Sequence, residues 1–196
     1  MSRISKLPVE QWDPELVSMT AGDTATVIEQ GITRMLAHCP EMAKGAIGFG
    51  AAITINRTLP ERLIELVRLR VAYHNQCRSC MAIRYSSAVD EVDEDLVCSL
   101  QQPQEAQDLT AAERVALDFA DRFATDHLSI TDERFSALRE HFNEAQTMEL
   151  LLHLALYVGM GRLAATLDMT EELPASFQAP FGEPVTPWGG EPINVS

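Results

Sequence analysis

Cys77 and Cys80 are the residues whose type and spacing most directly suggest chemistry. They are three positions apart within residues 72–85, AYHNQCRSCMAIRY, a stretch that otherwise has a helical pattern. If a helix begins near Cys77, Cys80 lies in its first turn, where free backbone N–H groups and the helix dipole stabilise a thiolate. Such a thiolate attacks a peroxide or a disulfide, and a second thiol can resolve the product. Arg78 and Arg84 flank the pair and would add positive potential. Buried structural cysteines and metal ligands share the CxxC spacing, so those interpretations stay open.

Glu65 is the nearest acidic residue that could serve this pair. It lies twelve residues before Cys77, on a predicted helix, and on a face of that helix that is more apolar than polar. A carboxylate in an apolar setting can have a raised pKa and accept a proton from a thiol or from water. An ion pair with Arg68 or Arg62 is an equally good interpretation of Glu65, because residues three positions apart are neighbours on a helix.

The composition limits the class of protein. The chain has 196 residues, an apolar fraction of 46% and a net charge of −14, which predicts one domain, or two small ones closely packed, with an acidic surface. Nucleic acids and anionic membranes attract clustered Lys and Arg, so neither is expected as a partner.

Cysteine usage and the first residues predict a cytoplasmic location. The N-terminal sequence MSRISKLPVEQWDPEL lacks the apolar core of a signal peptide. In a reducing cytosol a close cysteine pair is more often catalytic, redox-sensing or metal-binding than a structural disulfide. The other two cysteines, Cys39 and Cys98, have no partner pattern and are interpreted as buried small hydrophobes.

Residues 150–167, LLLHLALYVGMGRLAATL, are apolar enough to raise the question of a membrane span. They are barely long enough to cross a bilayer and contain His153 and Arg162. We therefore interpret them as a buried helix of an oligomer, and we interpret His153 as a core histidine.

Hydrophobic periodicity predicts an all-α fold, and signals for β-strands are scarce. Thr110 and Glu113 form a capping box ahead of an apolar helix, and Asp23 is a plausible N-cap. The expected helices cover residues 23–38, 41–57, 60–74, 77–89, 93–100, 110–123, a stretch from 131, and 143–167. The expected organisation is an N-terminal segment (1–22), one domain (23–170, with halves 23–100 and 110–170) and an irregular Pro- and Gly-rich tail (171–196).

Glu65, a gap of eleven residues and Cys77-x-x-Cys80 resemble the signature of the alkyl hydroperoxidase D / carboxymuconolactone decarboxylase superfamily. The stretch RLIELVRLRVAYHNQCRSCMAIR is typical of its peroxidase-related members, and LTAAERVALDFADRF and the text after it look like the second portion of that family. The resemblance covers residues 20–170 approximately. It implies a helical bundle of about seven to eight helices and a homo-oligomer, which could be a dimer, trimer or hexamer.

The resemblance also implies roles for the site residues. Cys80 would be the peroxidatic cysteine, Cys77 the resolving cysteine and Glu65 a proton relay. The family has histidines where this chain has Ser79 and Arg84. Arg84 could stabilise a thiolate, but it cannot shuttle a proton, because arginine does not deprotonate in proteins.

His74, three residues before Cys77, is the nearest candidate for the missing relay. The competing interpretation is a residue in the last helical turn that binds a free backbone carbonyl.

We therefore predict a thiol-dependent peroxidase or disulfide reductase, acting on a small peroxide or disulfide and recharged by a thiol protein or carrier. No cofactor or metal is expected, since the chain has neither a Gly-rich loop after a strand nor HExxH. Three alternatives remain: a lyase of the decarboxylase branch, a non-catalytic helical oligomer with structural cysteines, and a zinc site built on His74, Cys77 and Cys80. A zinc site usually needs a second close ligand pair, and the chain has none.

Overall fold

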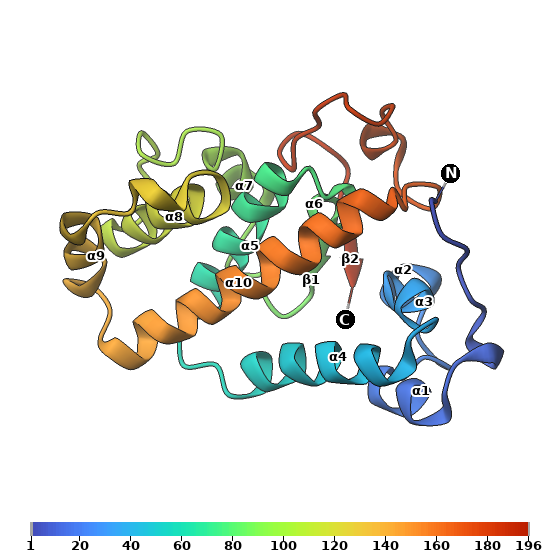
Figure 1. The fold of residues 1–196 in the computed structure, drawn as a ribbon. Coiled ribbons are helices and arrows are strands. Elements are labelled where there is room, and N and C mark those ends of the chain that lie inside the picture. The colour runs from blue at the N-terminus through green and yellow to red at the C-terminus, as the bar shows by residue number, and fades with distance from the viewer. Residues whose placement is uncertain (1, 196) are drawn as a thin grey trace.

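The computed structural model describes residues 2–195, and their regular secondary structure is almost entirely helical (Figure 1). The α-helices are α1 (Pro14–Thr20), α2 (Val27–Gln30), α3 (Thr33–Leu36), α4 (Pro40–Ile55), α5 (Glu61–Asn75), α6 (Arg78–Ala82), α7 (Glu94–Ser99), α8 (Ala111–Thr125), α9 (Asp132–Arg139) and α10 (Glu144–Leu167). Three short 3-10 turns, η1 (Val9–Gln11), η2 (His127–Ser129) and η3 (Ala175–Phe177), and two strands, β1 (Ile83–Tyr85) and β2 (Ile193–Val195), complete the fold. The predicted all-α class is confirmed.

Helix α5 is the centre of the main core. It packs along α10 on one side and along α8 on another. Four side chains of α5 are completely buried: Leu66, Val67, Leu69 and Val71. Leu117 of α8 belongs to the same core and is also completely buried. Burying a side chain of this kind contributes roughly 1.5–3 kcal/mol. This packing makes α5 a rigid platform for the residues at its C-terminal end.

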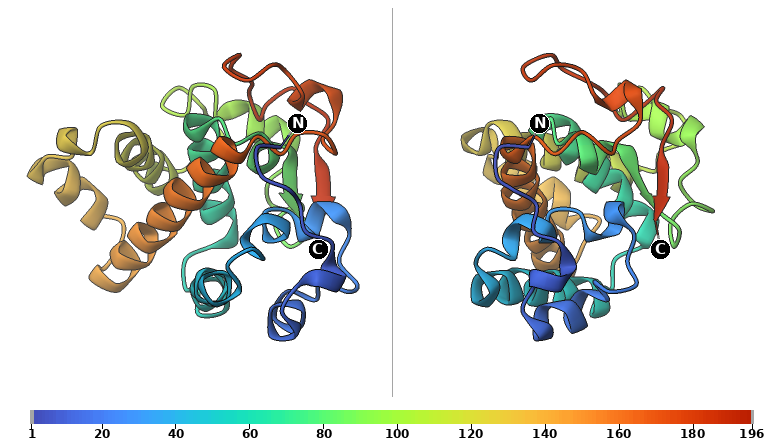
Figure 2. Two further views of the ribbon diagram at one scale, coloured as in Figure 1. Left: turned by 45° about the vertical axis from the view of Figure 1, so that its right-hand side comes forward. Right: turned by 90° about the vertical axis from the view of Figure 1, so that its right-hand side faces the viewer.

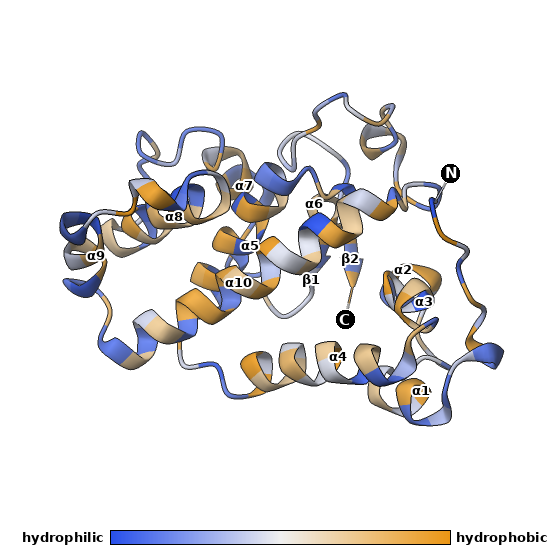
Figure 3. Ribbon diagram, in the orientation of Figure 1, coloured by the Kyte–Doolittle hydropathy of each residue, from blue (hydrophilic) through white to orange (hydrophobic). Residues whose placement is uncertain are grey.

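Helices α1 to α4 gather at one side of the molecule (Figure 2). A second apolar cluster, which includes Trp12, Leu16, Ala37 and Ala43, joins α1, α3 and α4. Helix α4 is apolar along most of its length (Figure 3), yet Ala43 and Ile53 are its only buried residues. A helix that is apolar all round is normally covered, so α4 has the composition of an interface helix.

The predicted starts of helices are confirmed where the sequence contains a capping motif. Thr110 accepts a hydrogen bond from the N–H of Glu113, and the Glu113 carboxylate accepts one from the N–H of Thr110 at 2.7 Å, which is the predicted capping box. Asn143 and Gln146 cap α10 in the same reciprocal way. These hydrogen bonds satisfy N–H groups that a helix start would otherwise leave unpaired.

Residues 2–195 contain ten α-helices, against about seven to eight expected, because α1 forms within the N-terminal segment and one predicted helix is divided in two. A second predicted helix is shorter than expected. Residues 23–38 form two short helices, α2 and α3, because the chain turns at Gly31 with φ of 42°, and the N-cap is Thr26 rather than Asp23. The helix expected over residues 77–89 ends at Ala82. After it the chain extends as β1 and pairs in parallel with β2 from the C-terminal tail.

Helix α10 is the one helix in residues 2–195 that is long and apolar enough to cross a membrane by length and composition. In the structure it lies against α5, α6 and α8, and His153 of α10 is buried. Only 33% of its apolar window is buried within residues 2–195, so the expectation of a buried helix is met in part.

Candidate functional site

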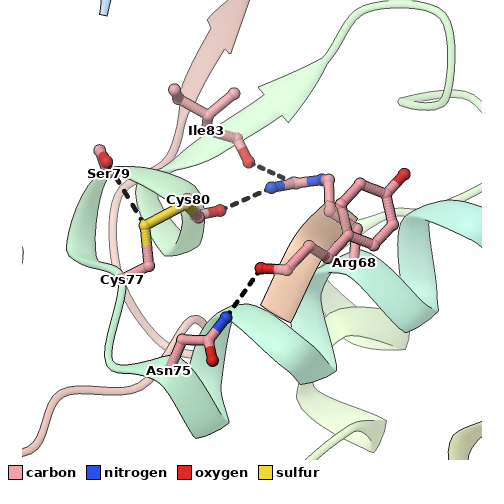
Figure 4. Close-up of a disulfide and its surroundings, with 7 residues drawn as sticks. Arg68, Asn75, Cys77, Ser79, Cys80 and Ile83 are labelled. Atoms are coloured by element: carbon pink, nitrogen blue, oxygen red, sulfur yellow. Dashed lines mark hydrogen bonds between the residues drawn. A yellow bond between two sulfur atoms is a disulfide. The ribbon is translucent and has the colours of Figure 1, made fainter. Parts of the chain in front are cut away.

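Cys77 and Cys80 are joined by a disulfide at the start of α6, with their Cα atoms 5.2 Å apart (Figure 4). Helix α5 ends just before them because Gln76 has a left-handed backbone, with φ of 51°, and reverses the chain. The N–H of Cys77 then bonds to the carbonyl of Ala72 at 3.0 Å. Cys77 is the N-cap residue of α6, so Cys80 lies in the first turn of that helix, as predicted.

The two sulfur-bearing residues differ in exposure. Cys77 is completely buried, and its Sγ lies 3.6 Å from Ser79 Oγ. Cys80 is half-buried and lines a cavity of about 320 Å³. A reagent in this cavity therefore reaches Cys80, whereas Cys77 is shielded. A second cavity of about 440 Å³ is lined by Ser79 and Arg162 but by neither cysteine.

Glu65 forms a buried ion pair with Arg68. The guanidinium donates to both carboxylate oxygens at 2.6 Å. Of the two interpretations of Glu65, the structure therefore contains the ion pair with Arg68, and Arg62 is bonded to Glu113 instead. These two hydrogen bonds form one bidentate ion pair, which holds the Glu65 carboxylate against Arg68.

Arg68 connects this ion pair to the disulfide segment. Its guanidinium donates to the carbonyl of Cys80 at 2.7 Å and to that of Ile83 at 2.8 Å (Figure 4). Burial acts to lower the pKa of Arg68, but the Glu65 carboxylate outweighs it and holds that pKa above its usual range. Arg68 therefore places a permanent positive charge beside Cys80 and at 5.0 Å from the ring centre of Tyr85.

Arg84 and Arg78 hold the C-terminal tail. Arg84 is buried, donates to Glu94 at 2.8 Å and also donates to the carbonyl of Pro187. Arg78 donates to the carbonyls of Ala179, Pro180 and Glu183. These bonds commit both arginines to the junction between α6 and the tail, and the arginine that bonds to the Cys80 backbone is Arg68.

His74 lies away from the cavity. Its Nε2 is 2.7 Å from Asp121 Oδ1, and Arg70 donates to both oxygens of the same carboxylate. Burial tends to raise the pKa of Asp121, but the hydrogen bonds from His74 and Arg70 outweigh it, so that pKa lies below its ordinary value. Neither interpretation of His74 included this partner, and His74 does not line the cavity that contains Cys80.

Tyr157 is a residue of the site that sequence reasoning missed. It lies on α10 and lines the same cavity as Cys80 and Arg68. Burial raises the pKa of its phenol above the usual range, although the positive charge of Arg68 acts in the other direction. Its hydroxyl is 3.2 Å from Nδ1 of His153, one helical turn earlier. The spacing of four residues was visible in the sequence, but the approach of α10 to α6 was not.

The zinc alternative requires His74 beside the two cysteines. Instead, His74 is paired with Asp121 and the cysteines are bonded to each other. No group of three or more His, Cys, Asp or Glu side chains suited to hold a metal ion occurs within residues 2–195.

Comparison with solved structures supports the fold. A peroxidase-related protein with an alkylhydroperoxidase AhpD core, from Ralstonia eutropha JMP134, is 20% identical, with a TM-score of 0.71 over 90% of this chain and 94% of its own. A protein of unknown function from Agrobacterium tumefaciens, suggested to be the antioxidant defence protein AhpD, is also 20% identical, with a TM-score of 0.63 over 71% of this chain and 97% of its own. No protein-family model matches the sequence, and no curated protein matches it significantly.

These likenesses establish that the chain has the AhpD-like fold. They agree with the resemblance seen in the sequence around Glu65, Cys77 and Cys80. The chain therefore combines the AhpD-like helical fold with a CxxC disulfide beside a cavity.

Proposed function

We propose that this protein is a thiol-dependent peroxidase and disulfide reductase, in which Cys80 attacks and Cys77 resolves. The observation that supports it most is the unequal exposure of one disulfide: Cys80 faces a cavity, and Cys77 is completely buried. A structural disulfide has no need of such a cavity, whereas a redox pair needs one sulfur within reach of its substrate.

The reaction proceeds from the reduced pair. The Cys80 thiolate attacks the outer oxygen of a hydroperoxide, the O–O bond breaks, and an alcohol leaves after it gains a proton. Cys80 is then a sulfenic acid, and the Cys77 thiol attacks its sulfur and releases water, which regenerates the disulfide. The charge of Arg68 and the first turn of α6 both stabilise the thiolate that starts the cycle.

A second thiol must reduce the disulfide in each cycle. We propose that a thiol protein or carrier attacks the sulfur of Cys80 because it lies at the cavity, so that Cys77 leaves as the first thiolate. Such a cycle needs a reducing compartment, and we propose that the protein works in the cytoplasm.

We also propose that copies of this chain associate as a homo-oligomer. Three large apolar side chains of α4, Met42, Phe49 and Ile55, are exposed, and Ile55 is 81% exposed. Covering them with a second copy would give α4 the burial that its composition leads us to expect. Sedimentation or light scattering would measure the assembly.

Turnover of tert-butyl hydroperoxide with dithiothreitol tests the function. Cys80→Ser should reduce peroxide consumption to the uncatalysed rate, because the attacking sulfur is lost. A Cys39→Ser/Cys98→Ser double variant is the control, since it removes the two free thiols and leaves the disulfide pair in place. Both free thiols are exposed, so the prediction that they are buried is wrong. If Cys80→Ser consumes peroxide as fast as the wild type, the proposal is wrong and a non-catalytic role for the cysteines becomes the better explanation.

A further inference from the structure

We infer that Tyr157 and His153 of α10 form the proton-transfer pair of this site, with Tyr157 in contact with the substrate and His153 behind it. This rests on the proposed function and supplies the relay that the chain lacks at Ser79 and Arg84.

The first observation is the position of Tyr157. It lines the cavity that Cys80 and Arg68 also line, and its backbone carbonyl accepts a hydrogen bond from Asn75 at 2.9 Å. Asn75 is the last residue of α5, so this bond ties α10 to the end of α5 directly before the disulfide segment. The tyrosine is therefore held on the wall of the cavity by the same element that precedes the cysteines.

The second observation is the state of His153. It is only 2% exposed, and its Nδ1 lies 3.2 Å from the Tyr157 hydroxyl. Its Nε2 is buried and has no hydrogen-bond partner among the residues that the structure describes. A buried core histidine normally bonds through both ring nitrogens. The sequence-based interpretation of His153 as an ordinary core histidine therefore leaves one nitrogen unexplained.

The charges around His153 keep it neutral and able to accept a proton. Burial lowers the pKa of His153, Arg57 at the start of the loop after α4 lowers it further, and Glu149, one turn before it on α10, acts to raise it. Glu149 is itself held by the N–H groups of Thr58 and Leu59 at 2.9 Å. With Nε2 protonated, Nδ1 is the free acceptor, and it faces the Tyr157 hydroxyl.

The proton balance closes with these two groups. By way of a water molecule in the cavity that both residues line, the Cys80 thiol passes its proton to the Tyr157 oxygen. The Tyr157 hydroxyl passes its own proton to Nδ1 of His153, which becomes imidazolium. After the thiolate has attacked the peroxide, the same two transfers run in reverse and deliver the proton to the leaving alkoxide. The net change is that a thiol and a hydroperoxide become a sulfenic acid and an alcohol, with no proton taken from outside.

The other candidates are less suited to this task. The Glu65 carboxylate is bonded twice to Arg68 at 2.6 Å, and Arg68 cannot release a proton. His74 is bonded to Asp121 and is absent from the cavity wall. Glu172 also lines the cavity, but its carboxylate is paired with Arg34 and Lys6. Tyr157 is instead bonded to a histidine, which can accept its proton.

Two leaving groups distinguish proton transfer from a merely structural role. Stopped-flow oxidation of the reduced protein is followed at pH 7 with tert-butyl hydroperoxide, whose alkoxide needs a proton, and with peracetic acid, whose carboxylate leaves without one. Tyr157→Phe should slow the first reaction by about 10²-fold and the second by much less, because general acid catalysis contributes about 10²–10⁴-fold where a proton is required. Tyr73→Phe is the matched control, since Tyr73 packs on Trp188 and does not line the cavity.

His153→Gln should also lower the rate with the alkyl hydroperoxide, and it should remove one ionisation from the pH profile of that rate. His127→Gln, at an exposed 3-10 turn, is its control. Circular dichroism and thermal unfolding establish that each variant is folded.

The outcomes separate the two proposals. If Tyr157→Phe slows both oxidants equally or neither, the proton-transfer inference is wrong while the peroxidase proposal survives, provided that Cys80→Ser is inactive. If Cys80→Ser is as active as the wild type, the proposed function fails and the inference fails with it.

Discussion

Helix α5 carries two charged clusters on different faces, and they are alike in bonding but unlike in surroundings. On one face Arg68 binds Glu65 and the carbonyls of Cys80 and Ile83. On the other Arg70 binds Asp121 and the carbonyl of Leu100. Each arginine therefore binds one carboxylate and ties α5 to a neighbouring segment through at least one backbone oxygen.

The difference between the clusters is what lies next to them. Arg68 lines the cavity with Cys80, and both partners of its ion pair are nearly fully buried. Asp121 in the other cluster is about a quarter exposed and pairs with His74. Both clusters therefore anchor α5, and the disulfide and the cavity beside Arg68 make the first cluster the candidate site.

The largest effect on stability is expected at the first cluster. Arg68→Ala leaves the Glu65 carboxylate buried without a partner, which should cost about 3–5 kcal/mol in the free energy of unfolding. Arg70→Ala should cost less, about 1–3 kcal/mol, because Asp121 keeps His74 and some solvent. Urea denaturation of the two variants measures the comparison, and equal losses would show that burial does not distinguish the clusters.

The second prediction concerns reactivity. A Glu65→Leu/Arg68→Met double variant removes both charges together, so that no unpaired charge is left in the core. It should raise the pKa of the Cys80 thiol by about one unit, and iodoacetamide should then alkylate Cys80 about tenfold more slowly at pH 7.

The matched change at the other cluster is Asp121→Leu/Arg70→Met, which should leave the alkylation rate of Cys80 unchanged. If both double variants slow alkylation to the same extent, Arg68 does not act on the sulfur.

The third prediction concerns how the stabilising effect of Asp121, in the second cluster, depends on pH. The folded-state pKa of Asp121 is depressed, so its contribution to stability is fully present above its unfolded pKa of about 4 and is lost as the pH falls through the lower folded value. Asp121→Asn should therefore lower the free energy of unfolding by about 1–3 kcal/mol at pH 6, and the deficit should shrink below pH 4. A deficit that is constant down to pH 3 would contradict an ionised Asp121.

The smallest effect compares two glycines of α10. A Cβ at Gly161 would lie 2.5 Å from the amide nitrogen of Asn75, at the end of α5, whereas a Cβ at Gly159 meets nothing within 4 Å. Gly159→Ala should raise the free energy of unfolding by up to about 1 kcal/mol through helix propensity. Gly161→Ala should gain nothing or lose stability, and thermal unfolding would show whether the two variants differ in sign.

Sequence reasoning succeeded where the determinants are local. The helices that begin near Pro60, Thr110 and Asn143 have strong periodicity and capping residues, and each was predicted to within one or two residues. The Glu65–Arg68 pair on α5 and the Cys77–Cys80 pair at the start of α6 also follow from short spacings in the sequence.

It failed where distant segments meet. The helix after Cys77 stops at Ala82 because β1 pairs with β2, more than a hundred residues later. The partner of His74 lies 47 residues away, and Tyr157 reaches the cavity only because α10 packs on α5 and α6. No pattern in a single sequence specifies these tertiary contacts.

Labelling of the sulfenic acid after one turnover tests most directly which cysteine attacks. Reduced Cys77→Ser and Cys80→Ser proteins are each mixed with one equivalent of tert-butyl hydroperoxide in the presence of dimedone, and the labelled residue is located by mass spectrometry. We predict dimedone on Cys80 in the Cys77→Ser protein and no label on Cys77 in the Cys80→Ser protein, because only Cys80 lines the cavity. Label on Cys77, with none on Cys80, would contradict the assignment of the attacking sulfur.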